Sequence, residues 1–585
     1  MRIHKATVGA VLTAVTVMVP LSLASAGPSI VTQQSASSST TSSSTTSSAT
    51  TELVVFFVKG SEASARQSIA AAGAQITGEL QSVGAARVTG GANLATELSG
   101  KAGIRGVVRN HSIGTVSPGM PHKFVEERAQ NDPTYAPGNT TPPPGGGSGA
   151  LKEGKKKSGW DPFSIYQWDM KMIGATPDGA HAVGTGKGVL VGVIDTGIDA
   201  SHPDLAANFD AALSRNFTTD IPEIDGPCEQ PSCIDPANVD EGGHGTHVAG
   251  TIAAATNGIG ISGVAPSATL VNLRAGQDSG YFFLFETLAA LEYAGNNGIN
   301  VVNMSFYTDP WLYNCDSADD IITGTQTAAQ IAEQGLIKQS ILAAVAYARS
   351  KNVTLVAAAG NEHTDLAATQ RADATSPDFG APASDRLLTR DCLDLPAEAP
   401  GVIEVSSIGP TKAKSDFSNY GQNEIDVAAP GGFFRDGFGT ADFRAPSNLI
   451  LSSYPLAVAQ AEGAVNKGGG VTDADFFKRD CAPTGVCGYY TYLQGTSMAS
   501  PHVAGVVALI VGKYGTPNGS GGFTMTPDAV YAKLTGSATP TPCPTPPTVD
   551  YSNIGRTYTA TCVGDTAHNG FYGFGIVNAL AAVQP

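Results

Sequence analysis

The sequence GVLVGVIDTG, residues 188–197, is an apolar run that ends in a carboxylate and a glycine turn. Similar apolar runs, INVVNMS at 299–305 and VTLVAAAGN at 353–361, are separated from it by alanine-rich stretches of helical composition. Strands that alternate with helices along a chain form βαβ units, in which helices cover both faces of a parallel sheet. We therefore predict an α/β fold with a parallel sheet for residues 159–585.

The composition excludes several kinds of partner. Hydrophobic residues make up 42% of the 585 residues, which is enough for a large core, and charged residues only 15%. The net charge of −17 argues against nucleic acid and anionic membranes, because both repel an acidic surface. No stretch after the first 26 residues is apolar for long enough to span a bilayer, so we expect no membrane association after signal cleavage.

Residues 1–26 have the three parts of a secretory signal peptide. Arg2 and Lys5 form a basic start, an apolar stretch follows, and the segment ASA at 24–26 has the small-x-small pattern of a cleavage site. A membrane anchor is the alternative, but Thr, Ser, Gly and Pro interrupt the apolar run. We expect a secreted, extracellular protein.

The eight cysteines agree with export, because an even number in an oxidising compartment is typical of disulfides. Eight cysteines allow on the order of a hundred pairings, so the sequence leaves the connectivity open. Short spacings favour three pairs and leave a fourth: Cys228–Cys233, Cys481–Cys487, Cys543–Cys562 and Cys315–Cys392. No CxxC or Cys/His cluster indicates a metal.

Two linkers flank a small unit in the first quarter of the chain. Residues 27–51 are rich in Ser and Thr, and residues 117–158 in Pro, Gly and Lys. Between them, residues 52–116 show the element order of the ferredoxin-like split βαβ motif. Its strands are expected at 53–58, 74–79, 85–88 and 106–116, and its helices at 62–72 and 93–100.

Three segments carry residues with the chemistry of catalysis. Asp195 ends an apolar strand, at the edge of a parallel sheet where active sites form. His244 opens a small-residue helix in HGTHVAGT, and Ser497 starts a helical stretch in GTSMASPHVAG, where backbone N–H groups and the helix dipole face its oxygen. Taken singly, the aspartate and the serine could be ordinary helix caps.

The spacing of His244 and His247 also resembles a zinc motif. It is one residue short of the i, i+4 pair that shares a helix face, and the glutamate of HExxH is absent. We therefore predict that His247 is a buried structural residue and that His244 is the reactive one.

Together these segments resemble the subtilisin-like serine proteases, and the chain is identified as a suspected member of this family. The family's signatures appear as VIDTGID around Asp195, HGTHVAGT from His244 and GTSMASPHVAG around Ser497. A fourth match, VAAAGNE, puts Asn361 at the position of the family's oxyanion-hole asparagine. The resemblance covers about residues 160–585 and implies a subtilisin-like α/β fold.

The resemblance implies a serine endopeptidase that acts on proteins or peptides through an acyl-enzyme. Ser497 would attack the carbonyl while the neutral imidazole of His244 takes its proton. Asp195 would orient the imidazole, and Asn361 would donate to the oxyanion. No cofactor is implied for this chemistry, and we expect a monomer.

The resemblance also implies a structural calcium site. Its carboxylate would be Asp204, in HPDL, and a loop after the His244 helix would supply most of the other ligands. The implied ligands are the side chain of Asn257, the carbonyls of Ala255, Ile259 and Ile261, and an amide oxygen from Gln167. Such an all-oxygen set suits Ca²⁺. An ordinary surface turn is the alternative.

By the same resemblance, residues 52–116 would be the family's propeptide, a folding assistant and inhibitor that self-processing removes. A binding module that stays in the mature protein is the alternative. The position of this unit before a lysine-rich connector favours a removable segment.

The sequence departs from the family after Ser305, where Phe306-Tyr307 replaces the usual Leu-Gly. The resemblance places substrate binding at Ser305, Phe306, Tyr307, Ala358 and Gly360. An aromatic in place of glycine would narrow the cleft. Insertions at about 307–345, 363–398 and 433–490 are expected to rim the cleft or brace loops.

Two functions from other classes stay open. A catalytically silent relative that binds peptides is favoured by the altered Phe306-Tyr307 segment and opposed by the four intact chemical positions. A serine esterase is disfavoured by the order Asp, His, Ser and by the absence of a GxSxG elbow around Ser497.

Overall fold

The computed structural model describes residues 51–110, 159–378, 385–519 and 521–584. The predicted signal peptide, nearly all of the Ser/Thr-rich linker and the connector at 117–158 lie outside these ranges. Within them, no helix combines the length and the apolar character that a bilayer crossing requires.

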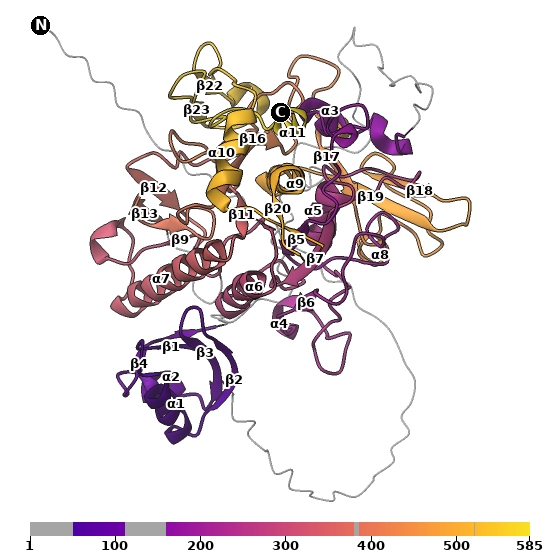
Figure 1. Ribbon diagram of the computed structural model, residues 1–585. Helices are drawn as coiled ribbons and strands as arrows, with labels where there is room; N and C mark the ends of the chain where they lie inside the picture. Colours follow the sequence, from indigo (N-terminus) through magenta and orange to yellow (C-terminus); the bar gives the residue numbers. More distant parts are fainter. Residues whose placement is uncertain (1–50, 111–158, 379–384, 520, 585) are drawn as a thin grey trace, which may run out of the picture. The chain divides into compact units, whose positions relative to one another are not determined.

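A seven-stranded sheet forms the centre of residues 159–584 (Figure 1). Its order is β16-β15-β11-β8-β5-β7-β6, and all of its strand pairs are parallel. The strands are β5 (Leu190–Ile194), β6 (Arg215–Asn216), β7 (Thr269–Arg274), β8 (Val301–Met304), β11 (Thr354–Ala358), β15 (Ile403–Ile408) and β16 (Val427–Pro430). This sheet confirms the predicted α/β class.

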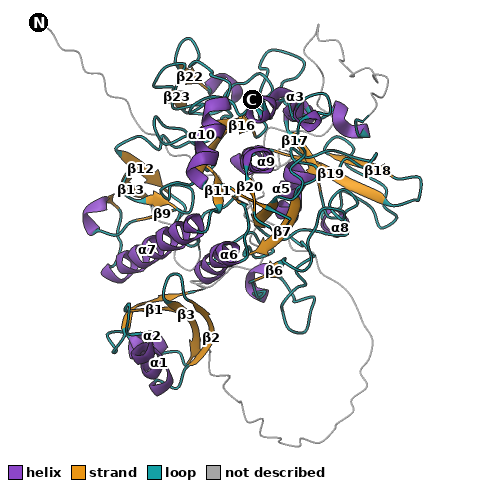
Figure 2. Cartoon of the chain, viewed as in Figure 1, coloured by secondary structure: helices purple, strands orange, loops and turns teal. Residues whose placement is uncertain are grey.

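Helices cover both faces of this sheet (Figure 2). Alternate strand residues face opposite ways, so Val301 packs with α5 (His244–Ala253) and α9 (Thr496–Tyr514), whereas Val302 packs with α6 (Leu284–Asn296) and α7 (Ala328–Ser350). Because both faces are buried, the strands are nearly continuous apolar runs. Smaller helices complete the fold: α3 (Trp168–Ile173), α4 (Pro222–Asp225), α8 (Leu456–Ala461), α10 (Pro527–Ser537) and α11 (Ala579–Val583).

The N-terminal unit forms an antiparallel sheet in the order β2-β3-β1-β4. Its elements are β1 (Thr51–Phe57), α1 (Glu62–Ala71), β2 (Gln75–Leu80), β3 (Ala85–Gly90), α2 (Leu94–Leu98) and β4 (Ile104–Arg109). This order is that of the split βαβ motif. The run LVVFF is buried on both faces, because Leu53 and Val55 pack under the unit's own helices and Val54 and Phe56 pack against residues of α6 and α7.

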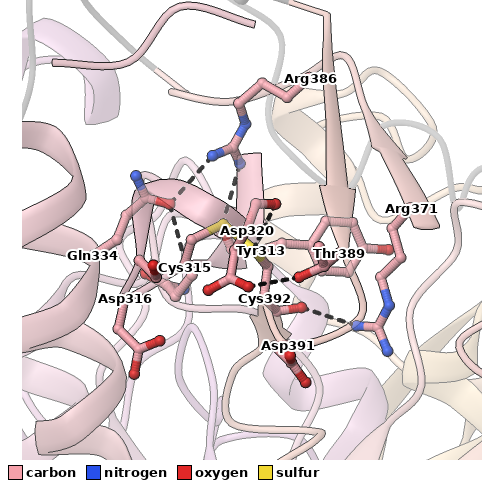
Figure 3. The surroundings of a disulfide bond; sticks show 12 residues. Tyr313, Cys315, Asp316, Asp320, Gln334, Arg371, Arg386, Thr389, Asp391 and Cys392 are labelled. Atoms are coloured by element: carbon pink, nitrogen blue, oxygen red, sulfur yellow. Dashed lines mark hydrogen bonds between the residues drawn. A yellow bond between two sulfur atoms is a disulfide. The ribbon is translucent and has the colours of Figure 1, made fainter. Parts of the chain in front are cut away.

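The first two insertions fold together. The small strands β10 (Ile321–Thr323), β12 (Gln370–Asp373) and β13 (Arg386–Thr389) form one sheet, and β9 (Tyr313–Asn314) pairs with β14 (Leu393–Asp394). The Cys315–Cys392 disulfide joins the insertions, and Arg386 donates to the Tyr313 carbonyl and to Gln334 beside it, each at 3.2 Å (Figure 3). The two insertions therefore brace each other.

The third insertion forms a three-stranded sheet in the order β17-β19-β18. Its strands are β17 (Ile450–Ser453), β18 (Phe477–Cys481) and β19 (Cys487–Leu493), and the Cys481–Cys487 disulfide joins the last two. Two-residue and three-residue strands form the pairs β20 (Thr516–Pro517) with β21 (Phe523–Thr524) and β22 (Thr548–Asp550) with β23 (Thr559–Thr561). With Cys228–Cys233 and Cys543–Cys562 also present, the favoured disulfide pairing is confirmed.

Candidate active site

Asp195 and His244 form a buried hydrogen-bonded pair. Asp195 follows β5 at the carboxyl edge of the sheet, and His244 is the first residue of α5. The His244 Nδ1 lies 2.8 Å from the Asp195 Oδ1, and the two side chains are 2% and 0% exposed. Burial raises the pKa of Asp195, and the neighbouring His244 opposes this shift. A carboxylate held out of water in this way stabilises an imidazolium beside it.

The start of α5 is fixed by Asp240, a residue that the sequence analysis did not single out. Its Oδ1 accepts the Gly243 N–H at 2.8 Å, and its Oδ2 accepts the Thr246 N–H at 2.9 Å. The N-cap residue is Gly243, so Asp240 reaches the helix start from three residues before the cap, where a capping residue is not sought in a sequence. Gly245 lets the helix approach β5, because a Cβ there would lie 2.2 Å from the Gly197 carbonyl oxygen.

His247 is structural, as predicted. It is fully buried, and its Nε2 lies 3.1 Å from the Ile450 carbonyl oxygen and 3.2 Å from that of Thr491. Two carbonyl acceptors require that this nitrogen carry the proton, so it is not a metal ligand. Burial lowers the pKa of His247 to about 3, which keeps the ring neutral.

Ser497 is the second residue of α9 and is 3% exposed. Asn361, which follows β11, reaches the same helix start. Its Oδ1 accepts both the N–H and the hydroxyl of Thr496, each at 2.9 Å. These two bonds fix the orientation of the Asn361 amide next to the serine. The helix that carries Ser497 packs directly against α5, the helix that His244 opens, and Asn361 contacts the start of α9.

Ser305 supports the first turn of α9 with its side chain. Its Oγ lies 2.9 Å from the Ser500 Oγ and donates to the Ser497 carbonyl at 3.3 Å. The Asn303 amide donates to the Ser305 Oγ at 2.9 Å. The side chain of this predicted substrate-binding residue is therefore occupied by contacts within the protein, and only its backbone remains for a substrate.

The side chains of Phe306 and Tyr307 contact other side chains of the protein. Phe306 is buried and stacks on Phe282 with ring centroids 3.9 Å apart. The Tyr307 hydroxyl donates to the Asp378 carboxylate at 2.6 Å, which links this segment to the second insertion. The aromatic replacement of Leu-Gly thus connects the strand end to an insertion.

Ala358 is the last residue of the neighbouring strand β11, and Gly360 lies two residues after it. β8 and β11 are adjacent and parallel, so 305–307 and 358–360 leave the sheet side by side. Gly360 has a φ of 95°, and a Cβ there would lie 2.4 Å from the Asn419 amide nitrogen. Only glycine fits this position, which explains its place in the motif.

The predicted calcium site is assembled, but its arrangement does not fit a cation. Both oxygens of Asp204 accept protein donors. Oδ1 accepts the Asn257 amide at 3.1 Å, and Oδ2 accepts the Ile261 N–H at 3.2 Å and the Tyr490 hydroxyl at 2.8 Å. Gln167 is committed as well, since its amide makes two bonds to the Ser262 backbone. A calcium ligand must turn its lone pairs toward the ion. Here the lone pairs of the Asp204 oxygens face the hydrogens of N–H and O–H donors.

The Tyr490 hydroxyl fills the space that the loop would leave for an ion. A Cβ at Gly260 would lie 1.8 Å from the Tyr490 oxygen, so the loop that carries Asn257, Ile259 and Ile261 closes around the hydroxyl. Ala255 also contacts Asp204, because its N–H donates to the Asp204 carbonyl at 2.8 Å. Tyr490 belongs to the third insertion and supplies a donor where the resemblance implied an ion.

We expect Tyr490→Phe to lower the free energy of unfolding by about 1–3 kcal/mol, because a buried carboxyl loses a donor. Burial raises the pKa of Asp204 to about 7, so the carboxyl is largely protonated at pH 5 and ionised at pH 8. The hydroxyl stabilises the ionised form, and the loss should therefore be larger at pH 8. Urea unfolding at both pH values measures it.

Tyr492→Phe, on the same strand, is the matched control and should have a smaller effect. Equal losses for the two variants, or a Tyr490→Phe protein that binds Ca²⁺ and is stabilised by it, would contradict the account of the loop.

The fold and the site together define a class of protein. A parallel α/β sheet carries a buried Asp–His pair at its carboxyl edge and a serine in the first turn of its central helix, which is the architecture of a serine hydrolase. The chain belongs to the Subtilase family, whose profile matches residues 186–575. Subtilases are serine endopeptidases, and the protein is an enzyme of this class.

Individual relatives agree with this assignment. The chain is 28% identical to subtilisin DY of Bacillus licheniformis over 399 residues, 68% of this chain and 92% of the relative. It is 29% identical to the M-protease of Shouchella clausii over 59% of each chain. The crystal structure of the epidermin leader peptide processing serine protease of Staphylococcus aureus superposes with a TM-score of 0.58 at 21% identity, covering 92% of this chain and 98% of that one. This last similarity supports the fold.

Proposed function

We propose that the protein is a secreted serine endopeptidase, made as a self-processing precursor, in which Ser497 forms an acyl-enzyme. The observation that carries this proposal is the buried 2.8 Å hydrogen bond between His244 and Asp195. In this bond the His244 Nδ1 carries a proton and donates it to the carboxylate. The other ring nitrogen, Nε2, then has no proton and can accept one.

In the first half of the reaction, the Ser497 oxygen bonds to the carbonyl carbon of a peptide while its proton passes to the His244 Nε2. Asp195 stabilises the resulting imidazolium. Collapse of the tetrahedral intermediate breaks the C–N bond, and the leaving amine takes the proton from His244. Water then attacks the ester by the same route and regenerates the serine.

The oxyanion of each tetrahedral intermediate needs donors that are already in place. The backbone N–H of Ser497 points out of the helix start, where four N–H groups lack helical partners. The Asn361 amide would supply a second donor. Its oxygen is held by Thr496, so the donor requires no reorganisation during the reaction.

We expect Asn361→Ala to lower kcat on a peptide substrate by about 10²–10³-fold with little change in KM, because the donor acts mainly in the transition state. Steady-state hydrolysis of a chromogenic peptide measures the loss. Asn553→Ala, at an exposed position, is the control for unspecific effects.

Asn361→Asp separates the oxyanion role from positioning of Thr496. It keeps an oxygen that accepts from Thr496 but has no N–H to donate. A loss as large as that of the alanine variant supports the oxyanion role, and recovery of activity by the aspartate would contradict it.

The N-terminal unit is proposed to be the inhibitory propeptide, and its contacts with α6 support this role. Arg87 forms an ion pair with Glu286 at 3.2 Å, and the Asn110 amide donates to the same carboxylate at 3.1 Å. The Ser82 N–H donates to Glu292 at 2.7 Å. Each contact pairs a donor of the unit with a carboxylate of the helix, so the unit and the enzyme have complementary surfaces.

Packing supports the same proposal. Val54, Phe56 and Leu80 of the unit are buried in one cluster with Leu288 and Ala289 of α6. Gly78 lies flat on Phe285, since a Cβ there would be 2.8 Å from the ring. A unit of about 60 residues has too small a core to be stable alone, so burial against the enzyme would order both partners.

A further inference from the structure

Pro501 removes a hydrogen bond from the first turn of α9, the turn that carries Ser497. A helix ordinarily pairs the carbonyl of each residue with the N–H four residues later. Proline has no N–H, so the helix cannot supply this donor to the Ser497 carbonyl. The Ser305 hydroxyl supplies a donor instead, at 3.3 Å. A contact from outside the helix therefore helps to hold the turn in which the serine lies.

The next carbonyl, that of Met498, is bonded by a side chain as well. His502 is fully buried, and its Nδ1 lies 2.8 Å from the Met498 carbonyl oxygen. A carbonyl oxygen can only accept, so this ring nitrogen must carry a proton. The imidazole takes no part in the proposed acyl transfer, although it is bonded to the residue that follows Ser497.

Asp169 holds the other side of the His502 ring. The His502 Nε2 lies 3.0 Å from the Asp169 Oδ2, and both side chains are at most 1% exposed. The second oxygen of Asp169 has no hydrogen-bond partner among the residues that the structure describes. A buried carboxylate is costly unless it is paired, so the bond to His502 compensates its burial. A carboxylate bonded to one ring nitrogen fixes the orientation of the ring and the position of its protons.

The helix of Asp169 is anchored independently of α9. α3 begins after Gln167, whose amide makes two bonds to the Ser262 backbone. The Trp168 indole N–H donates to the Leu449 carbonyl at 3.0 Å. Asp169 therefore projects from a short helix that is fixed at its start. A chain of bonds leads from this helix through the imidazole to the first turn of α9.

We propose that His502 is a positioning residue for the acyl transfer by Ser497. Its Nδ1–H, which Asp169 orients, holds the Met498 carbonyl and with it the turn that presents the nucleophile. The inference rests on the proposed function, because the turn needs this precision only if Ser497 attacks a substrate. A displacement of about 1 Å can lower a rate by about a hundredfold. Side-chain bonds to two successive carbonyls limit such a displacement.

Asparagine and glutamine at position 502 separate the two bonds of the ring. The amide nitrogen of asparagine lies near the place of Nδ1, so His502→Asn keeps a donor for the Met498 carbonyl and leaves Asp169 unpaired. The amide nitrogen of glutamine lies near the place of Nε2, so His502→Gln keeps the bond to Asp169 and removes the donor for the carbonyl. Lys513→Gln, at an exposed position of the same helix, is the control.

The variants are made in the full chain, and kcat and KM are measured on a chromogenic peptide. Titration with a fluorophosphonate gives the concentration of active sites to which kcat refers. We expect His502→Gln to lower kcat by about tenfold to a hundredfold with KM nearly unchanged, and His502→Asn to stay within about threefold of the parent. The order of Tm should be the opposite, with His502→Asn lower, because it leaves a buried carboxylate without its partner.

A purely structural pair would affect Tm and leave kcat per active site alone. Equal kcat values for the two variants therefore overturn the proposal, as does a larger loss of kcat in His502→Asn than in His502→Gln. If either variant does not fold, Asp169→Leu replaces the pair, because it retains the imidazole and removes its anchor. We expect Asp169→Leu to lower kcat by about tenfold, and an unchanged kcat would overturn the proposal.

Ser497→Ala distinguishes a failure of this inference from a failure of the proposed function. If the parent and Ser497→Ala hydrolyse the peptide at equal rates, or not at all, Ser497 is not the nucleophile and the inference fails together with the function. If only the parent is active and both His502 variants match it in kcat, the inference alone is overturned.

Discussion

Ser497→Ala is expected to lower kcat on a peptide substrate by about 10⁶-fold and to leave the precursor uncleaved. Alanine has no oxygen to form the acyl-enzyme, and the remaining rate comes from the oxyanion donors and substrate binding alone. The mass and the N-terminal sequence of the secreted protein measure processing, and hydrolysis of a chromogenic peptide measures activity. Ser552→Ala, at an exposed position, is the control.

The processing experiment has three informative results. Loss of the first hundred or so residues from the native chain only, with retention in Ser497→Ala, supports both the nucleophile and the propeptide. Retention in both chains contradicts self-processing. Loss in both chains indicates cleavage by another protease, and the peptide assay then decides on activity by itself.

Asp195→Asn is expected to lower kcat by about 10⁴-fold. The fold should remain intact, because Asn has the same shape. Its amide N–H₂ would donate to the His244 Nδ1, however, which forces the proton onto Nε2. That tautomer cannot take the proton of Ser497. Steady-state kinetics should therefore show a loss in kcat, with KM nearly unchanged.

Circular dichroism and the unfolding midpoint of Asp195→Asn confirm that the fold is retained, and Glu223→Gln serves as the control for removal of a negative charge. A loss of less than tenfold, or a loss confined to KM, would contradict the assigned role of Asp195.

The central sheet and the four motifs could be predicted from the sequence because their signals are local. The run that ends in Asp195 encodes a buried strand and the turn after it within ten residues. HGTHVAGT and GTSMASPHVAG each encode a helix together with the residue at its start. In such segments the hydrophobic pattern, the turn glycine and the polar residue lie next to one another in the chain.

The hydrogen bonds at the implied calcium ligands around Asp204 could not be predicted, for the opposite reason. Tyr490 bonds to Asp204 across 286 residues, and nothing near Asp204 in the sequence indicates that a hydroxyl from a distant insertion fills the loop. The carboxylates around Arg274 are also scattered in the sequence, from Asp220 to Asp278. Only the fold shows that their oxygens converge around Arg274.

The structure of the insertions could be predicted only in part. Short spacings suggested three of the disulfides, and the fourth followed as the remaining pair. The pairing of β10 with β13 and of β9 with β14 was not predictable, because strands of two to four residues have no periodic signal. The hydrogen bond from Tyr307 to Asp378 joins residues 71 apart in the sequence and has no local signal either.

The most direct test of the central claim is covalent labelling of the purified protein with a fluorophosphonate, which reacts with activated serine hydroxyls. Intact mass and peptide mapping locate the label. The account predicts one label per chain, on Ser497, slowed by a competing peptide substrate and strongly reduced in His244→Ala. No label, a label on another serine, or equal labelling of His244→Ala would contradict it.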